Sequence, residues 1–506
     1  MKETNQLKAG VILSYLNLSI GMVVPLLYTP IMLRLMGQAE YGLYQLSNTI
    51  TGYLSLLSLG MGNAILRYLM KYHAAGDRDM FCRTAGLFQA VYGIIAGLTV
   101  LVGVVLTRFT DVLFAEGLSA AEIQKMNILL LIMAVGTGLS FLGSVYNGII
   151  YCHERHIFQK VVGIVGTIVL PVANLVGLYL GYASIGLAVI GVTLSALTQL
   201  LNVWYCYRKL DIMLCFRQLP WYLLKEIIPF SLFLFLSMVA DMLFWAVDKV
   251  FIGALMGTAA VAVYNIGVTF QSIMQNMNGA ISGVFAPRVN AIVFSGKPIS
   301  ENSDLLIRIG RVQYLILSLI LSGFVVFGKC FLALWAGAGY EEAYTVALLT
   351  MFPMCVPLIQ NVAFNTLLAL NRHQFRSVMY ITMAVINAVS TYLLIPVMGI
   401  IGAALCTCIV VLLGQGLILN IYYNKKIGLD IARFWTNILK LTVVPAALAT
   451  AMKLISFEFS NIWKLLIGMV AYTGMFCVLS WLFSMNQYEK GLILGLVRKL
   501  LPRKDK

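Results

Sequence analysis

Long apolar runs recur along the whole length of this 506-residue chain. Most extend for about 18 residues or more, which lets each cross the roughly 30 Å hydrocarbon core of a bilayer as a helix. The chain is 60% hydrophobic and 11% charged, whereas soluble domains carry roughly 25% charged residues. The runs lack the alternating polarity of membrane β-strands. The sequence therefore predicts an all-α polytopic membrane protein.

Hydropathy predicts fourteen membrane-spanning helices. The predicted segments are 10–33, 42–66, 84–106, 127–149, 161–181, 184–206, 227–250, 259–286, 312–335, 343–369, 377–396, 401–423, 435–454 and 462–484. The first segment is too long for the core of a signal peptide and lacks a small-residue cleavage site, so we expect it to be retained.

Lysine and arginine collect on one side of this predicted arrangement. With the N-terminus in the cytoplasm, 27 of the 35 basic residues fall in cytoplasmic segments, as the positive-inside rule expects. We therefore place both termini in the cytoplasm. The net charge of +15 reads mainly as a topology signal. It suits an anionic inner leaflet, and because the basic residues are scattered over short loops it does not indicate nucleic-acid binding.

The sequence repeats itself at long range. "LMGQAEYGLYQLSNT" from Leu35 aligns with "LMGTAAVAVYNIGVT" from Leu255, and "RHIF" from Arg155 returns as "RHQF" from Arg372. Six spans is an even number, so both copies enter the membrane from the same side and form parallel repeats. We predict two six-helix lobes, residues 1–223 and 224–428, followed by two extra spans and a basic tail, residues 429–506.

The two RHxF tetrads fall at equivalent cytoplasmic corners, after the fourth and tenth spans. Arg155, His156, Arg372 and His373 are therefore candidates for a cytoplasmic gate or a headgroup contact. The alternative is an interfacial anchor, with cations on the cytoplasmic side and the aromatic ring at headgroup level. Both interpretations stay open.

Acidic residues occur inside the seventh predicted span. Asp241 lies about 14 residues from its cytoplasmic end, which is roughly 20 Å of helix. An ionised aspartate at that depth costs on the order of 3 kcal/mol, so it is by default a functional candidate. Asp248 is seven residues further on and shares the face. Alternatively, Asp241 pairs structurally with a neighbouring helix, and Asp248 and Lys249 form a snorkelling pair at the interface.

Polar side chains also follow one face of the eighth span, where the steps between Gln271, Gln275, Asn278 and Ser282 fit a helix. This stripe suits a hydrated, sugar-compatible cavity, or else ordinary hydrogen bonding between helices. Arg34 and Arg67 are candidates for a phosphate, which arginine binds bidentately, although cytoplasmic placement alone explains Arg67.

Nine cysteines lie mostly in or beside predicted spans. None has metal-ligand spacing with histidine, so we expect free thiols and no metal site. We also find no nucleophile–base pair and no glycine-rich phosphate loop. The longest external loop has about 20 residues, which disfavours a membrane-embedded polymerase or glycosyltransferase. The acidic residues predicted within the membrane also disfavour a scaffold protein without transport activity, because burying them costs energy that such a protein does not need to spend.

Several stretches resemble one family in order and spacing. They are "RLMGQAEYGLYQL" from Arg34, "SLGMGNAILRYLMK" from Ser58, "DKVFIGALMGTAAVAVYNIG" from Asp248 and "NAVSTYLLIPVMGIIGAALCT" from Asn387. Over essentially the whole chain the sequence resembles the polysaccharide-exporter and O-antigen flippase family. That family belongs to the superfamily that also holds multidrug extruders and lipid II flippases. The resemblance implies two six-helix lobes in an inverted V, often with two further helices.

The resemblance also implies a function. It implies a flippase of the bacterial cytoplasmic membrane that moves undecaprenyl-diphosphate-linked oligosaccharide outward by alternating access, coupled to H⁺ or Na⁺. Arg34, Arg67, Asp248 and Lys249 match motif positions of the family, whereas Asp241 rests on the burial argument. A multidrug or cation antiporter and a lipid II flippase of the same fold are the alternatives. The expected partners are the lipid-linked substrate, membrane lipids and proteins of polysaccharide assembly, with no cofactor.

Overall fold

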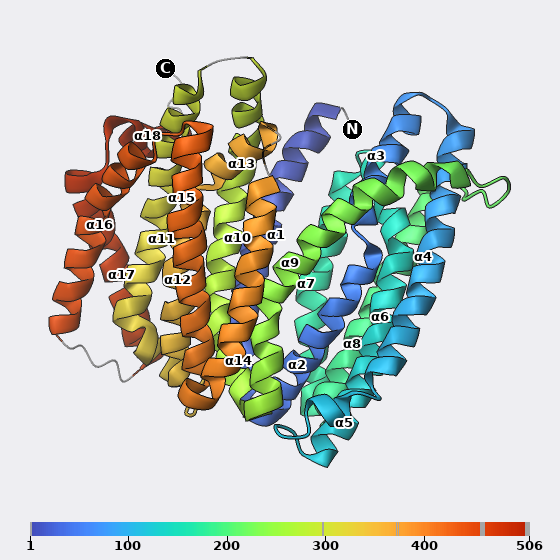
Figure 1. Cartoon of the computed structure of the whole chain (residues 1–506), viewed down its shortest axis with the longest axis horizontal. Coiled ribbons are helices and arrows are strands. Elements are labelled where there is room, and N and C mark those ends of the chain that lie inside the picture. The colour runs from blue at the N-terminus through green and yellow to red at the C-terminus, as the bar shows by residue number, and fades with distance from the viewer. Residues whose placement is uncertain (1–2, 296–297, 371, 373, 456–460, 501–506) are drawn as a thin grey trace. The chain divides into compact units, whose positions relative to one another are not determined.

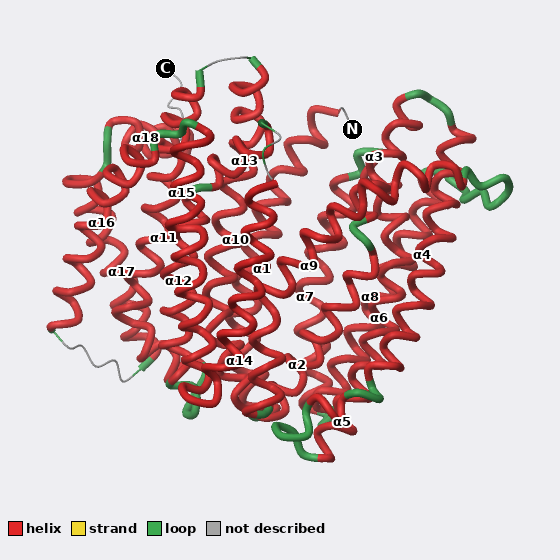
Figure 2. Tube along the Cα trace, viewed as in Figure 1, coloured by secondary structure: helices red, strands yellow, loops and turns green. Residues whose placement is uncertain are grey.

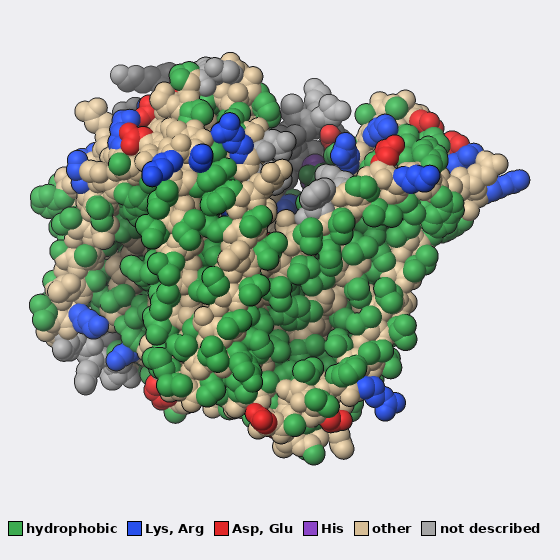
Figure 3. Space-filling model, viewed as in Figure 1, with side chains coloured by type: hydrophobic (Ala, Val, Ile, Leu, Met, Phe, Trp, Pro, Cys, Tyr) green, Lys and Arg blue, Asp and Glu red, His purple; other side chains and the backbone are tan. Residues whose placement is uncertain are grey.

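The computed structural model describes residues 3–295, 298–370, 372, 374–455 and 461–500. These residues form helices and loops, without a strand among them (Figures 1 and 2). Side chains on the middle of the helices are largely hydrophobic on the visible face, and lysine and arginine gather near helix ends (Figure 3). The prediction of an all-α polytopic membrane protein is confirmed.

Among the described residues, eleven helices, or up to twelve if the bent pair at Trp221–Pro229 and Leu234–Met256 forms one span, are long and apolar enough to cross a membrane. The predicted number of fourteen is therefore not confirmed. One reason is that the segments predicted at 377–396 and 401–423 both lie in the continuous 54-residue stretch Gln374–Ile427. This stretch contains a kink at Gly399, which has a φ of 59°.

The chain packs as two compact units, Met1–Val263 (unit 1) and Tyr264–Lys506 (unit 2). Unit 1 contains α1 (Glu3–Met36), α2 (Gln38–Leu54), α3 (Met61–Ala74), α4 (Arg78–Leu106), α5 (Thr110–Leu113), α6 (Ala120–Cys152), α7 (His156–Tyr179), α8 (Ala183–Lys209) and α9 (Leu224–Met256). The boundary between the units falls inside α10 (Thr258–Phe294). This division rests on packing, so the lobes predicted from the repeats, residues 1–223, 224–428 and 429–506, stay a prediction.

The long helix α6 is the centre of unit 1. It contacts α2, α3, α4, α7 and α8. Its C-terminal half joins a continuous buried cluster that includes Phe88, Tyr92, Phe141 and Ile149. A capping box fixes where α6 begins, because Ser119 and Glu122 each accept the backbone N–H of the other.

The segment predicted as the second span is interrupted. After α2 the chain makes a 3₁₀ turn at Ser55–Ser58, and Leu59 and Gly60 follow with φ of 50° and 69° before α3 begins. Positive φ suits glycine but costs energy at leucine. The interruption separates α2 from α3, and both helices pack on α6 and contact α9.

Unit 2 continues with α11 (Ile299–Trp335), α12 (Glu342–Ile359), α13 (Asn361–Ala369), α14 (Gln374–Val411), α15 (Leu419–Tyr422), α16 (Ile431–Leu454), α17 (Ile462–Leu479) and α18 (Gln487–Leu500). Wide π turns occupy Leu412–Ile418, Tyr423–Ile427 and Ser480–Ser484. The helix α11 contacts α12, α13, α16 and α17. It therefore holds the two extra C-terminal helices against the rest of this unit.

Candidate functional site

The acidic face of α9 lies in unit 1. Asp248 is 3% exposed, whereas Asp241, two helical turns earlier, is exposed. Tyr53 of α2 and the neighbouring Lys249 interact electrostatically with Asp248. An acid buried beside a cation and a phenol can hold its charge or take up a proton as its surroundings change.

Small residues bring α2 and α9 together at this place. A Cβ on Gly52 would lie 2.8 Å from Cε of Met242, and one on Gly253 would lie 2.7 Å from Leu46. Small residues at a helix interface let the backbones approach closely in a membrane. The tight contact explains why Asp248 is covered by its neighbours.

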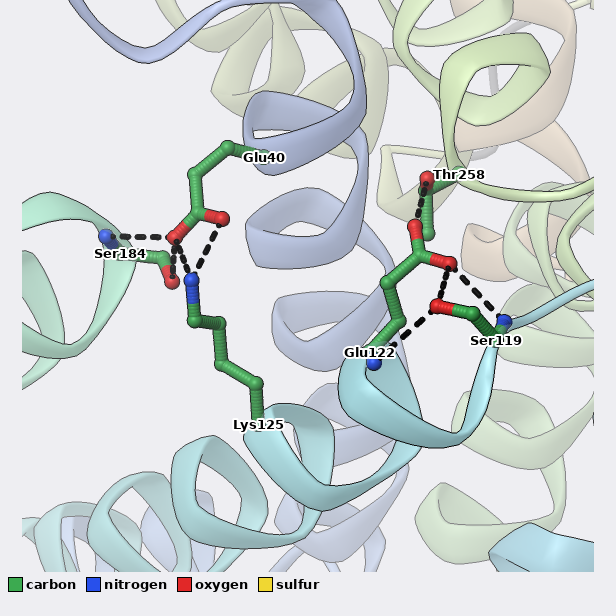
Figure 4. Close-up of polar contacts among 6 residues, drawn as sticks. All are labelled: Glu40, Ser119, Glu122, Lys125, Ser184 and Thr258. Atoms are coloured by element: carbon green, nitrogen blue, oxygen red, sulfur yellow. Dashed lines mark hydrogen bonds and ion pairs between the residues drawn. The ribbon is translucent and has the colours of Figure 1, made fainter.

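A polar cluster forms where several helices of unit 1 begin (Figure 4). Glu40, in the first turn of α2, accepts both bonds from Nζ of Lys125, at 3.0 and 2.8 Å. The same carboxylate accepts the backbone N–H of Ser184 at 3.1 Å and the hydroxyl of that serine. Glu40 therefore connects the N-terminal ends of α2, α6 and α8.

A second carboxylate lies nearby in the same view (Figure 4). Glu122 accepts from the hydroxyl of Thr258 at 2.7 Å and from the hydroxyl of Ser119 at 2.7 Å. Thr258 begins α10, so this bond connects the starts of α6 and α10. Negative charge is favourable at helix N-termini, where backbone N–H groups and the helix dipole leave partial positive charge. Glu40 and Glu122 thus stabilise the end of unit 1 at which these helices begin, by hydrogen bonds between neighbouring helices.

The sequence argument did not select Glu40 and Glu122. A signal was present in the sequence, because Glu40 lies in the "AEYG" stretch of the family-like motif, and Glu122 and Lys125 lie at the end of the loop that was predicted to be the longest external one. The pairing of Glu40 with Lys125 joins residues 85 apart. Sequence spacing alone could not have indicated it.

The polar stripe on α10 is buried in unit 2. Gln271 and Asn278 are 2% and 1% exposed. The Asn278 amide donates to the carbonyl of Leu358 at 3.1 Å, and Ser282 accepts from the Gln313 amide at 2.9 Å. These bonds run from α10 to α12 and α11, which is the interhelical alternative described above.

Gln275, the remaining member of the stripe, donates to Sδ of Met354 at 3.7 Å. Its part in lining a cavity stays a prediction, as it does for Gln271 and Asn278.

The two arginines proposed as phosphate ligands lie on separate helices of unit 1. Arg34 is in the last turn of α1 and Arg67 is in α3, and both are exposed. Their role stays a prediction.

The RHxF corners make matching contacts within each copy. Phe158 stacks on Tyr205 with ring centroids 3.9 Å apart, and Phe375 stacks on Tyr422 at 4.2 Å. Both members of the second pair lie 217 positions after those of the first. The contact therefore repeats along with the sequence.

The basic residues of the two RHxF corners make less similar contacts than the phenylalanines do. Arg155 precedes α7 and is exposed, and the His156 ring meets Tyr151 edge-on at 5.3 Å. Arg372 donates to the carbonyl of Lys426 at 3.0 Å, and His373 lies outside the described residues. The stacked phenylalanines favour an anchoring role for the corners.

Two further groups of charged or titratable residues escaped the sequence argument. Arg311 and Glu489 form an ion pair whose side chains are 6% and 2% exposed. His73 and His153 lie with ring centroids 4.4 Å apart at one end of unit 1. Burial, together with the nearby His73 and Arg155, lowers the pKa of His153 below its usual 6.5.

Within the described part of the chain, no group of three or more His, Cys, Asp or Glu residues could hold a metal ion.

The fold and these sites define a multi-pass helical membrane protein with acids inside its helices. The model of the family described as "Polysaccharide biosynthesis protein" matches residues 7–293. The chain belongs to this family. No curated protein sequence matches the chain significantly.

Solved structures share the fold at low sequence identity. "Lipid II flippase MurJ, inward closed conformation" has a TM-score of 0.70 at 14% identity and covers 94% of this chain and 98% of its own. An inward-facing multidrug resistance MATE family transporter of the MOP superfamily has a TM-score of 0.61 at 14% identity, with coverages of 87% and 99%. A MOP superfamily transporter from Pyrococcus furiosus scores 0.53 at 16% identity and covers 84% and 99%. The chain therefore has the fold of these transporters.

Proposed function

We propose that the chain is a flippase that moves an undecaprenyl-diphosphate-linked oligosaccharide from the inner to the outer leaflet of a bacterial cytoplasmic membrane. The observation that carries the proposal is its membership of the polysaccharide biosynthesis family, over residues 7–293. The fold shared with a protein named as a lipid II flippase supports it. Proteins that assemble the polysaccharide would be its partners.

The proposed mechanism is that of a secondary transporter with alternating access. A state open to the cytoplasm admits the glycan and diphosphate while the polyprenyl tail stays in lipid, and a second state releases the headgroup outside. Asp241 and Asp248 on α9 are the candidates for coupling to H⁺ or Na⁺, since acids at membrane depth commonly serve ion pathways. Both termini lie in the cytoplasm in this proposal.

A drug or cation antiporter is the second candidate function. The likeness to multidrug transporters of the MATE family, at a TM-score of 0.61, and the exposed Asp241 on α9 favour it. An efflux assay with a fluorescent organic cation separates the two functions, because a dedicated flippase leaves the cation concentration unchanged.

Translocation can be measured in spheroplasts of cells that lack the protein and carry a plasmid copy. A membrane-impermeant oxidant such as periodate modifies only lipid-linked glycan that has reached the outer leaflet. We expect Asp241→Asn and Asp248→Asn to slow the appearance of reactive glycan roughly tenfold or more, which corresponds to about 1.4 kcal/mol. The protein content of the membrane should stay unchanged.

The matched control is Asp111→Asn, which removes an exposed acid outside the long helices. It should leave translocation at the wild-type rate. Full activity in both α9 variants would remove the coupling role. Outward glycan that appears equally fast without the protein would refute the flippase itself.

A further inference from the structure

The α8–α9 loop, residues 210–220, lies at the end of unit 1 where α4 begins, and Figure 1 shows it projecting beside α4. Its inner face packs on the helices. Ile212 is 5% exposed and belongs to the buried cluster of unit 1. The backbone N–H of Cys215 donates to the carbonyl of Cys82 at 3.2 Å. A Cβ on Gly86 would clash with the carbonyl oxygen of Cys215, so the loop lies directly against α4.

Two residues of this loop have a left-handed backbone. Asp211 and Gln218 have φ of 52° and 55°, a conformation that costs energy in residues other than glycine. Both are bonded by arginines from the first two turns of α4. Arg78 donates to the carboxylate of Asp211 at 3.0 Å and to its backbone carbonyl. Arg83 donates to the amide oxygen of Gln218 at 3.0 Å. Strained backbone persists where the surrounding contacts enforce it, so these bonds fix which side chains the loop turns outward.

The outward-facing side chains are apolar. Met213 and Phe216 are 71% and 59% exposed, and Trp221 and Tyr222, which follow the loop directly, are 50% and 59% exposed. The neighbouring α3–α4 turn, residues 75–77, exposes only an alanine, a glycine and an aspartate. Neighbouring apolar side chains that are exposed outside the core mark an interaction surface. Tryptophan and tyrosine are enriched at the membrane–water interface.

Exposed basic side chains flank these apolar ones. They are Arg208, Lys209, Arg217 and Lys225. The two acids of the same stretch already have partners in unit 1, because Asp211 pairs with Arg78 and Glu226 accepts from the hydroxyl of Tyr68 at 3.0 Å. The outer face therefore combines apolar and aromatic side chains with positive charge, which is the composition of segments that lie on anionic membranes.

From these features we infer that residues 210–223 form a membrane-surface anchor that lies in the headgroup region of the bilayer and binds anionic phospholipids. The apolar side chains enter the boundary between headgroups and acyl chains, and the flanking basic side chains contact lipid phosphates. The loop follows directly on the candidate span Ala183–Lys209, so it starts where that span leaves the hydrocarbon. The inference goes beyond the proposed function, because it requires only that unit 1 spans a bilayer.

The depth of the anchor is measured on the full chain in liposomes of phosphatidylcholine and phosphatidylglycerol. Nitroxide labels are attached to Phe216→Cys and, as an independent second position, to Met213→Cys. Ala75→Cys is the control, because Ala75 is exposed in the polar α3–α4 turn at the same end of unit 1. The exposed and half-buried native cysteines are first replaced by alanine: Cys82, Cys215, Cys330 and Cys477.

Molecular oxygen concentrates in the hydrocarbon, whereas a water-soluble nickel chelate stays outside it. We expect both labels of the anchor to be relaxed several times more by oxygen than by the nickel chelate. The label at the control position should show the reverse order, because the turn that carries it faces water.

The preference for anionic lipid is measured by native mass spectrometry of the full chain with added phosphatidylglycerol or phosphatidylcholine. Arg217→Gln should weaken binding of phosphatidylglycerol about fivefold, since a basic residue near an anionic surface contributes about 1 kcal/mol, and should leave binding of phosphatidylcholine unchanged. Arg108→Gln is the matched control. Arg108 is also exposed but lies beyond the other end of α4, so its substitution should have no effect.

The inference is overturned if both labels of the anchor respond to the nickel chelate as the control does. It is also overturned if both are shielded from the two reagents and broadened by spin–spin contact, since a second copy of the chain then covers this face. Unchanged phosphatidylglycerol binding in Arg217→Gln would refute the recognition of anionic lipid.

Discussion

Substituting Glu489 by glutamine should strongly destabilise unit 2, because the carboxylate is the buried counter-charge of Arg311. Two bonds join them, Nε to Oε1 at 2.5 Å and Nη2 to Oε2 at 3.0 Å. Arg311 also donates to the carbonyls of Ser484 and Asn437. The pair thus connects α11 to the start of α18 and to the π turn that follows α17.

The magnitude follows from the burial of both groups, which are 6% and 2% exposed. Removal of one member of a buried pair costs about 3–5 kcal/mol, since the remaining charge stays desolvated. Arg433 and Asp304 provide the comparison, because this pair also reaches α11 but is 60% and 48% exposed. Asp304→Asn should cost at most about 1 kcal/mol.

The assay is unfolding by SDS of the purified protein, followed with a thiol-reactive dye. Cys355, Cys406 and Cys408 are buried free cysteines of unit 2 and react only when it opens. Glu489→Gln should lower the unfolding free energy several times more than Asp304→Asn. The double variant Arg311→Met with Glu489→Leu should recover most of the loss, since no unpaired charge remains. Equal, small losses in Glu489→Gln and Asp304→Asn would refute the argument.

Two more predictions concern unit 1. A Cβ on Gly42 would lie 1.7 Å from the carbonyl oxygen of Thr258, so Gly42→Ala should cost about 1–3 kcal/mol. A Cβ on Gly62 would meet nothing within 4 Å, so Gly62→Ala should be neutral. Unfolding by SDS is followed here through Cys152 and Cys206, the buried free cysteines of unit 1. The pKa of His153 lies below its usual 6.5 in the folded protein, so the unfolded state binds the proton more tightly and stability should fall as the pH drops below about 6.5. The unfolding free energies at about pH 7.5 and pH 5.5 should show this loss in the wild type and much less of it in His153→Gln.

Hydropathy and short motifs predicted the class of this protein well. Backbone groups in lipid must be satisfied within each segment, so a long apolar run has almost no alternative to a helix. Four motifs, among them "RLMGQAEYGLYQL" from Arg34, indicated the family by their order and spacing together, and the family match confirms it. The helical period also predicted that Asn278 and Ser282 share one face of their helix, and the amide nitrogen of Asn278 lies 3.4 Å from the hydroxyl oxygen of Ser282.

The partners of these residues could not be predicted. The period of α10 indicates which side chains share a face but not which helix covers them, so the bond from Asn278 to Leu358 was not foreseen. The pair of Arg311 and Glu489 joins residues 178 positions apart. Without homologous sequences, no local pattern connects such positions. The number of spans differs partly because the sequence predicted two separate spans, 377–396 and 401–423, where the structure has one helical stretch, Gln374–Ile427, with a kink at Gly399.

The interruption after α2 has a mechanical consequence for a duplicated chain. At the repeat offset of 220, Leu59 corresponds to Gly279, which lies inside the unbroken 37-residue helix α10. Rotation at Leu59 and Gly60 breaks no i to i−4 hydrogen bond, whereas bending α10 at Gly279 would break at least one. The segment at Leu59 and Gly60 can therefore bend at a lower cost than the segment of α10 that aligns with it, so two stretches matched by the sequence repeat differ in stiffness.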